Sequence, residues 1–420
     1  MKPKNQYGNL QNLGYLIWAK IPFKYLEDSQ LGQFLERDLS RESSAYLRKL
    51  HLLKTEVLST VDELKARDIA RIRTGASWSE WDMPQGKTWI TWYLSLFAKN
   101  FQVLPNVSFT SYKQTDTGET NIPPRVLASC AAFTHEVIRI AGNDFDEIEI
   151  WNEYNLVTDW KHDPGYRKFI PMATMAAMVA RNHGKLAVLG GVSSVKPARL
   201  AVIEQFARTG MLQYFDVIGF HNLRGTWSDN TPPPSLQEQA ASVRKAASVP
   251  ADPEALKLLQ AEMIELASGY EEVQQIVRQE IDRQRTGEIS VWLTEYGFPP
   301  IDPMKDYSQE HLEDIQVALF AHSVDLLLKG EIERIYWFTL RDDSRWPSLR
   351  QKTTGWEDIL QYYYGDIRED GSLKLLGRLL IEGGPLKVLE YARSRNLWHL
   401  IDGASLARRM PSDYVSQQVT

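Results

Sequence analysis

The 420-residue sequence has little cysteine, no long apolar run and no excess of positive charge, and each absence excludes a class of protein. A single cysteine, Cys130, forms no disulfide within the chain, and zinc sites built on several thiolates are excluded. Cys130 lies in the apolar run VLASCAAF, where we expect a small buried side chain. No stretch of about 18 uninterrupted apolar residues occurs, so we expect no membrane span.

The charge balance is mildly acidic. The formal net charge is −6, the isoelectric point is near 5.9, and no basic stripe stands out. Nucleic acid is therefore not the expected partner. The N-terminal stretch MKPKNQYGNLQNLGYLIWAK has no apolar core of signal-peptide length, which leads us to expect a cytoplasmic protein.

Short apolar, β-branched runs recur along the chain, with helical patterns between them. Eight such runs are recognisable, at residues 14–23, 70–75, 101–110, 147–153, 185–191, 215–222, 291–297 and 334–340. Strands and helices that alternate at this spacing indicate βαβ units and a parallel sheet. An open dinucleotide-binding sheet would need a Gly-rich phosphate loop after its first strands, and none is present. The pattern therefore predicts an α/β fold, a closed (β/α)8 TIM barrel.

Parts of the chain exceed what a barrel needs. We divide it into residues 1–56, a first strand and helical elaboration packed on the barrel; residues 57–385, the barrel itself; and residues 386–420, a C-terminal helix and tail. Residues 222–290 are too long for one crossover, so we predict an insertion after strand six that covers one barrel face as a lid. Thr60 and Glu63 have capping-box spacing, which predicts a helix N-terminus there.

Two glutamates, Glu153 and Glu295, each end a strand, in EIEIWNE and VWLTEYG. Functional residues of such barrels lie at the C-terminal ends of the strands. Glutamate is costly to bury unpaired, so its presence at both strand ends calls for a chemical reason. Glycosidic bond cleavage needs two converging carboxyls, one protonated to assist the leaving oxygen and one ionised to attack the anomeric carbon. Strand alternation puts Glu295 on the face of Leu293 and Val291, which we take as the barrel interior.

Other strand ends supply further candidates for substrate contact: Arg73, Trp78, Asn152, His221, Tyr296 and Trp337. Some of these also have a structural interpretation, because Arg73 could pair with an acid such as Asp82, and Trp78 and Trp337 could be core residues. No His/Asp/Glu cluster has metal-ligand spacing, and no G-x-S-x-G nucleophile elbow occurs. We therefore expect neither a catalytic metal nor a serine nucleophile.

The motifs WNEYN and WLTEYGF resemble the acid/base and nucleophile signatures of clan A glycoside hydrolases, which are retaining enzymes on (β/α)8 barrels. More narrowly, RTGASWSEWDMPQGKTWITW, the Gly-Gly after strand five and DVIGFHNLRGTW are similar to β-xylosidase-like proteins related to glycoside hydrolase family 39. Some of these are fused to, or encoded with, sugar-nucleotide epimerases. The similarity covers roughly residues 57–225 and 288–380. Many relatives have Pro after the acid/base glutamate; Tyr154 stands there in this chain, a change that concerns loop stiffness rather than the reaction.

The resemblance implies a role for each candidate. It gives Glu153 as acid/base, Glu295 as nucleophile, Asn152 as the amide at the sugar 2-hydroxyl, Arg73 beneath the nucleophile, His221 beside it and Trp337 as the sugar platform. We expect Glu153 to have the drier setting, and Arg73 to keep Glu295 ionised. The predicted function is hydrolysis of a β-glycoside with retention, with carbohydrate as partner and no cofactor. A barrel that binds oligosaccharide or scaffolds a polysaccharide-making complex is the alternative, which two mutually repelling carboxyls disfavour.

Overall fold

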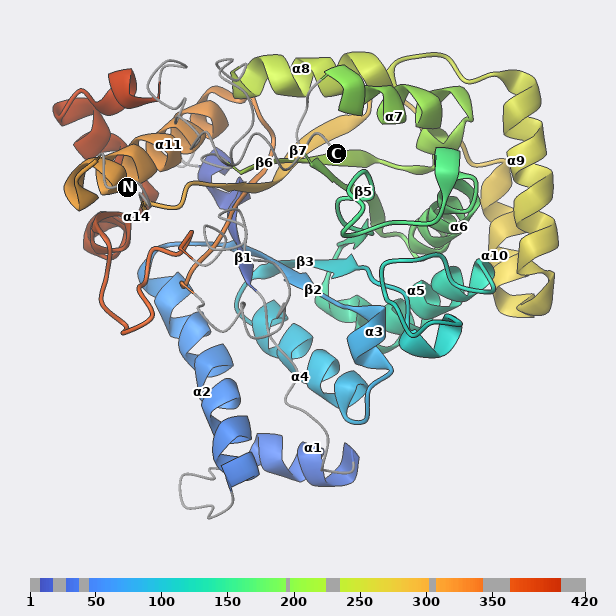
Figure 1. Cartoon of the computed structure of the whole chain (residues 1–420), viewed down its shortest axis with the longest axis horizontal. Helices are drawn as coiled ribbons and strands as arrows, with labels where there is room; N and C mark the ends of the chain where they lie inside the picture. Colours follow the sequence, from blue (N-terminus) through green and yellow to red (C-terminus); the bar gives the residue numbers. More distant parts are fainter. Residues whose placement is uncertain are drawn as a thin grey trace, which may run out of the picture.

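Eight parallel strands close into a barrel in chain order, which confirms the predicted fold (Figure 1). The computed structural model describes residues 8–17, 28–37, 45–193, 197–223, 235–301, 307–342 and 363–401. The strands are β1 (Leu13–Ile17), β2 (Arg71–Gly75), β3 (Gln102–Val107), β4 (Glu147–Ile150), β5 (Leu186–Ser193), β6 (Val217–Leu223), β7 (Ser290–Gly297) and β8 (Ile335–Trp337). Each predicted strand is present, and β1 pairs with β8 to close the ring.

Helices surround the barrel. They are α1 (Asp28–Glu36), α2 (Ala45–Ala66), α3 (Trp78–Trp81), α4 (Gly86–Ala98), α5 (Ala128–Ala141), α6 (Phe169–Asn182), α7 (Pro197–Arg208), α8 (Leu236–Ala247), α9 (Pro253–Leu266), α10 (Glu271–Ile281), α11 (Gln309–Lys329) and α14 (Leu375–Ser394). The predicted boundary at residue 385 falls within α14, beside Gly383 and Gly384, whose backbone is not helical. None of the helices in these ranges combines the length and the apolar content that crossing a membrane requires.

The strands separate two layers of buried side chains. A small apolar cluster fills the barrel interior, with one member from each of five strands: Leu104, Val188, Val217, Trp292 and Tyr336. The larger apolar cluster lies between the strands and the surrounding helices. Every second residue of a strand faces the interior. The interior is thus a packed core at its lower end and can hold a site only near the C-terminal ends of the strands.

Strand β7 departs from regular alternation. Leu293 pairs with Ile335 and belongs to the outer cluster, while Trp292 belongs to the interior, so the expected interior face of Leu293 and Val291 is wrong. The register against β6 shifts after Leu293. One extra residue in a strand reverses which side the following residues face. This bulge lets Glu295 point inward although Leu293 points outward.

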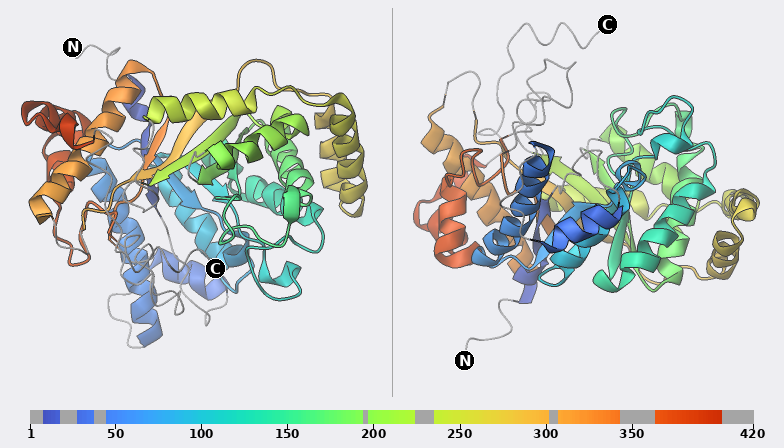
Figure 2. Two further views of the ribbon diagram at one scale, coloured as in Figure 1. Left: turned by 45° about the horizontal axis from the view of Figure 1, so that its top comes forward. Right: turned by 90° about the horizontal axis from the view of Figure 1, so that it is seen from below.

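Residues 222–290 contain three helices with two different positions. Helix α8 begins at a capping box of Ser235 and Glu238 and packs against α7 and β7, as a crossover helix of the barrel does. Helices α9 and α10 pack on the outer helices α5 and α6. They form one end of the molecule, opposite α14, in both views of Figure 2. The predicted lid is not formed by α9 and α10, and residues 224–234, which follow β6, lie outside the described residues.

A buried polar cluster of Tyr15, Arg67 and Asp366 lies beside the junction of β1 and β8. Asp366, which follows β8, accepts hydrogen bonds from Tyr15 Oη of β1 (3.2 Å) and from Arg67 Nε after α2 (3.0 Å). All three side chains are buried. An ion pair removed from water in this way holds only where its geometry is good. Tyr15 of β1 is therefore tied to a segment that follows β8, in addition to the β1–β8 ladder.

Candidate active site

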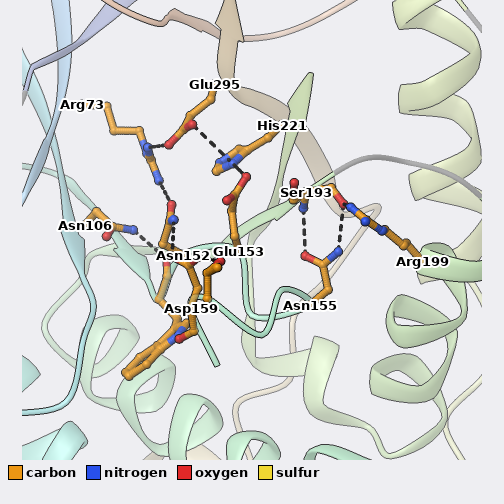
Figure 3. A network of polar contacts seen from close by, with 12 residues as sticks. Arg73, Asn106, Asn152, Glu153, Asn155, Asp159, Ser193, Arg199, His221 and Glu295 are labelled. Atoms are coloured by element: carbon orange, nitrogen blue, oxygen red, sulfur yellow. Dashed lines mark hydrogen bonds and ion pairs between the residues drawn. The ribbon is translucent and has the colours of Figure 1, made fainter. Parts of the chain in front are cut away.

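Arg73 is the centre of a polar network inside the upper end of the barrel (Figure 3). Its three nitrogens contact three residues: Nε donates to Glu149 Oε2 (2.5 Å), Nη1 to Glu295 Oε1 (2.6 Å) and Nη2 to Asn152 Oδ1 (2.8 Å). The alternative partner Asp82 is not among these contacts. Burial alone would lower the pKa of Arg73, but the carboxylates of Glu149 and Glu295 raise it above its ordinary value. Arg73 is therefore a fixed positive charge in contact with Glu295.

The backbone after β4 turns sharply, and the turn directs the side chains of Asn152 and Glu153 into the barrel. Trp151 and Glu153 have positive φ values of 69° and 36°, a region that costs non-glycine residues free energy. Asn106 Nδ2 donates to the Trp151 carbonyl (2.6 Å), and the Trp151 indole donates to the Asp159 carbonyl (3.1 Å). These contacts hold the turn, and Asn152 enters the network beside Arg73. Asn152 Nδ2 also donates to Asp159 Oδ1 (3.1 Å), so its second N–H is what it can offer a ligand.

The Gly-Gly pair of β5 makes room for this turn and for His221. A Cβ on Gly190 would lie 2.0 Å from the Trp151 carbonyl oxygen, and one on Gly191 would lie 1.9 Å from His221 Nε2. Both positions therefore require glycine. The Gly191 carbonyl also accepts from the backbone N–H of Glu153 (3.1 Å). The imidazole is thus seated between β5 and the carboxyl groups above it.

Glu153 and Glu295 meet at His221. His221 Nδ1 lies 2.8 Å from Glu153 Oε1 and 3.6 Å from Glu295 Oε2. One carboxyl oxygen of each glutamate and a nitrogen of His221 all lie within 4.8 Å of one another. Burial lowers the pKa of His221 to about 4, so the ring is neutral at pH 7, with Nδ1 within hydrogen-bonding distance of Glu153 Oε1. Carboxyl oxygens this close allow direct attack on a bound carbon and lie below the separation of about 6.5–9.5 Å found in enzymes that place a water between base and substrate.

The burial of the two carboxyls differs from expectation. The Glu153 side chain is 16% exposed and that of Glu295 is 6% exposed, so the drier setting belongs to Glu295 and our expectation was wrong. Burial raises the pKa of Glu295, while His221 and Arg73 oppose that rise and Glu153 adds to it. The Arg73 contact is what favours the ionised form of Glu295. Glu153 lies nearer the solvent at the barrel mouth.

The same three side chains offer oxygen and nitrogen atoms to a metal ion, yet they fit one poorly. Glu153, His221 and Glu295 would supply three ligand atoms. Glu295 is already bound by Arg73 Nη1 at 2.6 Å, and a divalent cation beside this guanidinium would be repelled. The arrangement is better suited to proton transfer and nucleophilic attack.

The loop that carries Glu153 is anchored on both sides. Tyr154 is buried against Phe169 and Phe206, with ring centroids 5.0 and 5.4 Å away. Asn155 exchanges two hydrogen bonds with the backbone of Ser193 at the end of β5 (2.8 and 2.9 Å; Figure 3). An aromatic anchor thus stiffens the residue that follows Glu153.

The predicted aromatic residues do not join the site. Trp337 packs edge-on against Tyr296 (5.5 Å) and against Phe320 of α11 (5.1 Å), so both residues lie in the outer layer. Both side chains are fully buried there. Since Tyr336 faces the interior, alternation along β8 directs Trp337 outward. Continued past the strand end, the same alternation directs the partly exposed Phe338 inward, where its ring packs edge-on against Tyr364 (5.1 Å). Phe338 is the aromatic candidate that the sequence reading missed, although its place beside Trp337 was the available signal.

Trp78 is also a core residue. It stacks on Phe133 of α5 with centroids 5.5 Å apart and an interplanar angle of 11°. Its indole is buried, so its face is already covered by protein. The structure thus brings Arg73, Asn152, Glu153, His221 and Glu295 together and leaves Trp78, Tyr296 and Trp337 outside the network. Glu149 and Asn106, which the sequence reading did not name, belong to it.

Comparison with known proteins gives structural similarity without a family assignment. No family model matches the sequence, and no curated protein matches it. Similar solved structures include an endo-laminarinase from Formosa (11% identity, 100% of this chain and 95% of that chain, TM-score 0.46) and a family 30 subfamily 8 xylanase from Clostridium acetobutylicum (9%, 89% and 71%, 0.45). A rice β-glucosidase is also similar (11%, 92% and 99%, 0.48). These likenesses concern the fold and assign no role to any residue of this chain.

Proposed function

We propose that this protein is a retaining glycoside hydrolase that cleaves a β-glycosidic bond by double displacement. The observation that carries the proposal is the contact of Glu153 and Glu295 through His221, with oxygens of the two carboxyls within 4.8 Å. Retaining enzymes hold their carboxyls about 5–5.5 Å apart, whereas inverting enzymes separate them by about 6.5–9.5 Å to admit water. Short separation, a strand-end position for both and a paired arginine together support retention.

The roles follow from the environment of each carboxyl. Glu295, bound by Arg73, attacks the anomeric carbon and forms the glycosyl-enzyme while the bond to the leaving oxygen breaks. Glu153, at the mouth, protonates that oxygen, then takes a proton from the water that attacks the same carbon and releases Glu295. The N–H of His221 fixes the carboxyl of Glu153 beside the reacting atoms. Asn152 offers its second N–H to a sugar hydroxyl, and Phe338 offers a ring face.

The finer assignments rest on the sequence resemblance. A β-xylosidase-like activity on a small β-glycoside belongs to this proposal. A cytoplasmic location, expected from the pattern of the N-terminal residues rather than from the resemblance, belongs to it as well. Carbohydrate is the partner it implies.

The test removes one carboxyl at a time. Glu295→Ala abolishes the glycosyl-enzyme, so turnover of aryl β-glycosides should fall by about 10⁴-fold or more. Added azide occupies the space left and gives a glycosyl azide of inverted configuration. In Glu153→Ala, a dinitrophenyl glycoside needs no protonation, so its first step stays fast, and azide speeds the second step with retained configuration.

Anomeric configuration of the azide products, determined by NMR, separates the two roles. Gln102→Ala, an exposed position at the start of β3, is the control and should behave as the parent. Binding of oligosaccharide without hydrolysis by the parent would favour the scaffold alternative. Unchanged turnover in both alanine variants would rule out this pair.

A further inference from the structure

Glu149 is a buried carboxyl that the mechanism does not use. It lies on β4, four residues before Glu153, and its side chain is fully buried inside the barrel. A buried ionised group costs several kcal/mol unless it is paired. Its Oε2 accepts from Arg73 Nε (2.5 Å) and from Asn106 Nδ2 (2.9 Å). The remaining oxygen, Oε1, has no hydrogen-bond partner among the described residues. The contact with Arg73 therefore offsets most of the free-energy cost of burying the Glu149 carboxylate.

We propose that Glu149 is a positioning residue for the nucleophile, because it orients the Arg73 guanidinium and offsets part of its charge at Glu295. This inference rests on the proposed function of Glu295. The guanidinium is planar and its donors diverge, so occupation of Nε by Glu149 sets the plane in which Nη1 reaches Glu295. One positive charge is shared between two buried carboxylates. Glu295 is thus stabilised as an anion, but less than an unshared arginine would stabilise it.

Sharing the arginine matters to the reaction. A nucleophile bound by an unshared guanidinium is less basic and forms the glycosyl bond more slowly. Without the arginine the pKa of Glu295, which burial already raises, would rise further and the ionised form would be less populated. Glu149 sets the balance between these two states. It touches neither the reacting atoms nor the mouth. Besides Arg73 it contacts Asn106, which holds the Trp151 carbonyl, and its charge raises the pKa of His221.

Glu147 provides a matched control on the same strand. It is two residues earlier, faces the same interior and is also buried, yet it pairs with Arg71 Nη1 (3.0 Å) and with Arg334. Arg334 in turn stacks over Trp292, 3.7 Å from the ring centroid, in the lower layer. The three partners of the Arg73 guanidinium do not include Glu147. Neutralising Glu147 therefore perturbs a buried ion pair of similar kind without changing the charge around Glu295.

The experiment compares Glu149→Gln and Glu147→Gln with the parent. Gln at 149 keeps an oxygen for Arg73 Nε and removes the negative charge. We expect the acidic limb of the kcat/KM profile on an aryl β-glycoside, which reports ionisation of the nucleophile, to move to lower pH by about one unit. We expect kcat to fall by about tenfold. Glu147→Gln should leave the limb where the parent has it. Thermal midpoints of both variants show whether loss of stability is comparable.

A second readout does not need turnover. In protein labelled with ¹³C at glutamate carboxyls, the Glu295 signal, assigned by its loss in Glu295→Gln, should titrate at lower pH in Glu149→Gln. If this shift is seen but the parent hydrolyses no glycoside, the effect of Glu149 on Glu295 is supported and the proposed function is overturned. Turnover that depends on Glu295, with no shift or with equal shifts in both variants, overturns the positioning role and keeps the function. Should Gln at 149 not fold, Met serves as a neutral substitute, and failure of both would overturn the proposal.

Discussion

At the scale of single residues, Arg73 decides how the site is assembled. One guanidinium holds Glu149, Asn152 and Glu295 with three separate nitrogens. Glu149 and Asn152 come from β4 and the turn after it, and Glu295 comes from β7 across the barrel. A side chain with diverging donors can bridge these strands, which a point charge cannot do. Arg73, one residue on β2, therefore positions Glu295 directly and Glu153 indirectly, through the neighbouring Asn152.

Replacing Arg73 by Lys tests this role. Lysine keeps the charge but cannot bind all three partners at once. We expect kcat/KM on an aryl β-glycoside to fall by about 100-fold, because lysine cannot keep both Glu295 and Asn152 where the transition state needs them. Arg71→Lys, two residues earlier and paired with Glu147 instead, should keep activity near that of the parent. Equal activity of Arg73→Lys and parent would contradict the proposed contact.

Sequence reasoning located the polar side chains of the site better than the aromatic ones. A carboxylate or guanidinium at a strand end has few places to go in a barrel, so Glu153, Glu295 and Arg73 could be identified from the sequence alone. An indole is equally stable inside or outside the strands. Trp337 and Tyr296 accordingly lie in the outer layer. Which side they face depends on strand register, and a single sequence does not reveal the bulge in β7.

At the scale of elements, local signals were outweighed by tertiary packing in one helix. Thr60 and Glu63 have capping-box spacing, yet both lie inside α2, and Thr60 Oγ1 donates to the Glu56 carbonyl one turn earlier (2.8 Å). The predicted helix start is wrong because apolar residues on both sides of Thr60 continue one buried face. In α8, by contrast, the capping box of Ser235 does begin the helix.

Helices α9 and α10 can be removed without touching the site. Asp252 N donates to the Arg208 carbonyl and Arg285 N to the Gln213 carbonyl, so both ends of the hairpin lie beside one turn and a short Gly-Ser linker can replace residues 253–284. We expect kcat/KM on an aryl β-glycoside within about threefold of the parent. The thermal midpoint should fall, because Val273 and related apolar residues no longer cover α5 and α6.

The control for this deletion is the choice of leaving group. A panel of β-glycosides with one sugar and several aglycones should keep the same order of preference in the deleted protein. A changed order, in a protein that still unfolds cooperatively, would show that the hairpin reaches the mouth and would restore the lid interpretation.

At the scale of the whole molecule, a buried ion pair between Arg67 and Asp366 lies beside the closed ring, and Tyr15 of β1 also donates to Asp366. Asp366→Asn keeps the shape of the side chain but leaves the buried Arg67 without a charged partner. We expect a loss of about 3 kcal/mol in the free energy of unfolding, measured by denaturant titration. Asp370→Asn, an exposed position in the next turn, should leave stability unchanged. A loss as small in Asp366→Asn as in Asp370→Asn would mean that the β1–β8 ladder alone closes the barrel.

This closure has a consequence for how the protein is made. Tyr15 and Asp366 are 351 positions apart, and β1 cannot pair with β8 until the ribosome has released residue 337. At about 5–20 residues per second, the nascent chain spends on the order of tens of seconds with one sheet edge unpaired. Open edges recruit strands from other chains. Lower growth temperatures and chaperones that shield such edges should therefore raise the yield of folded protein more than changes near the catalytic pair.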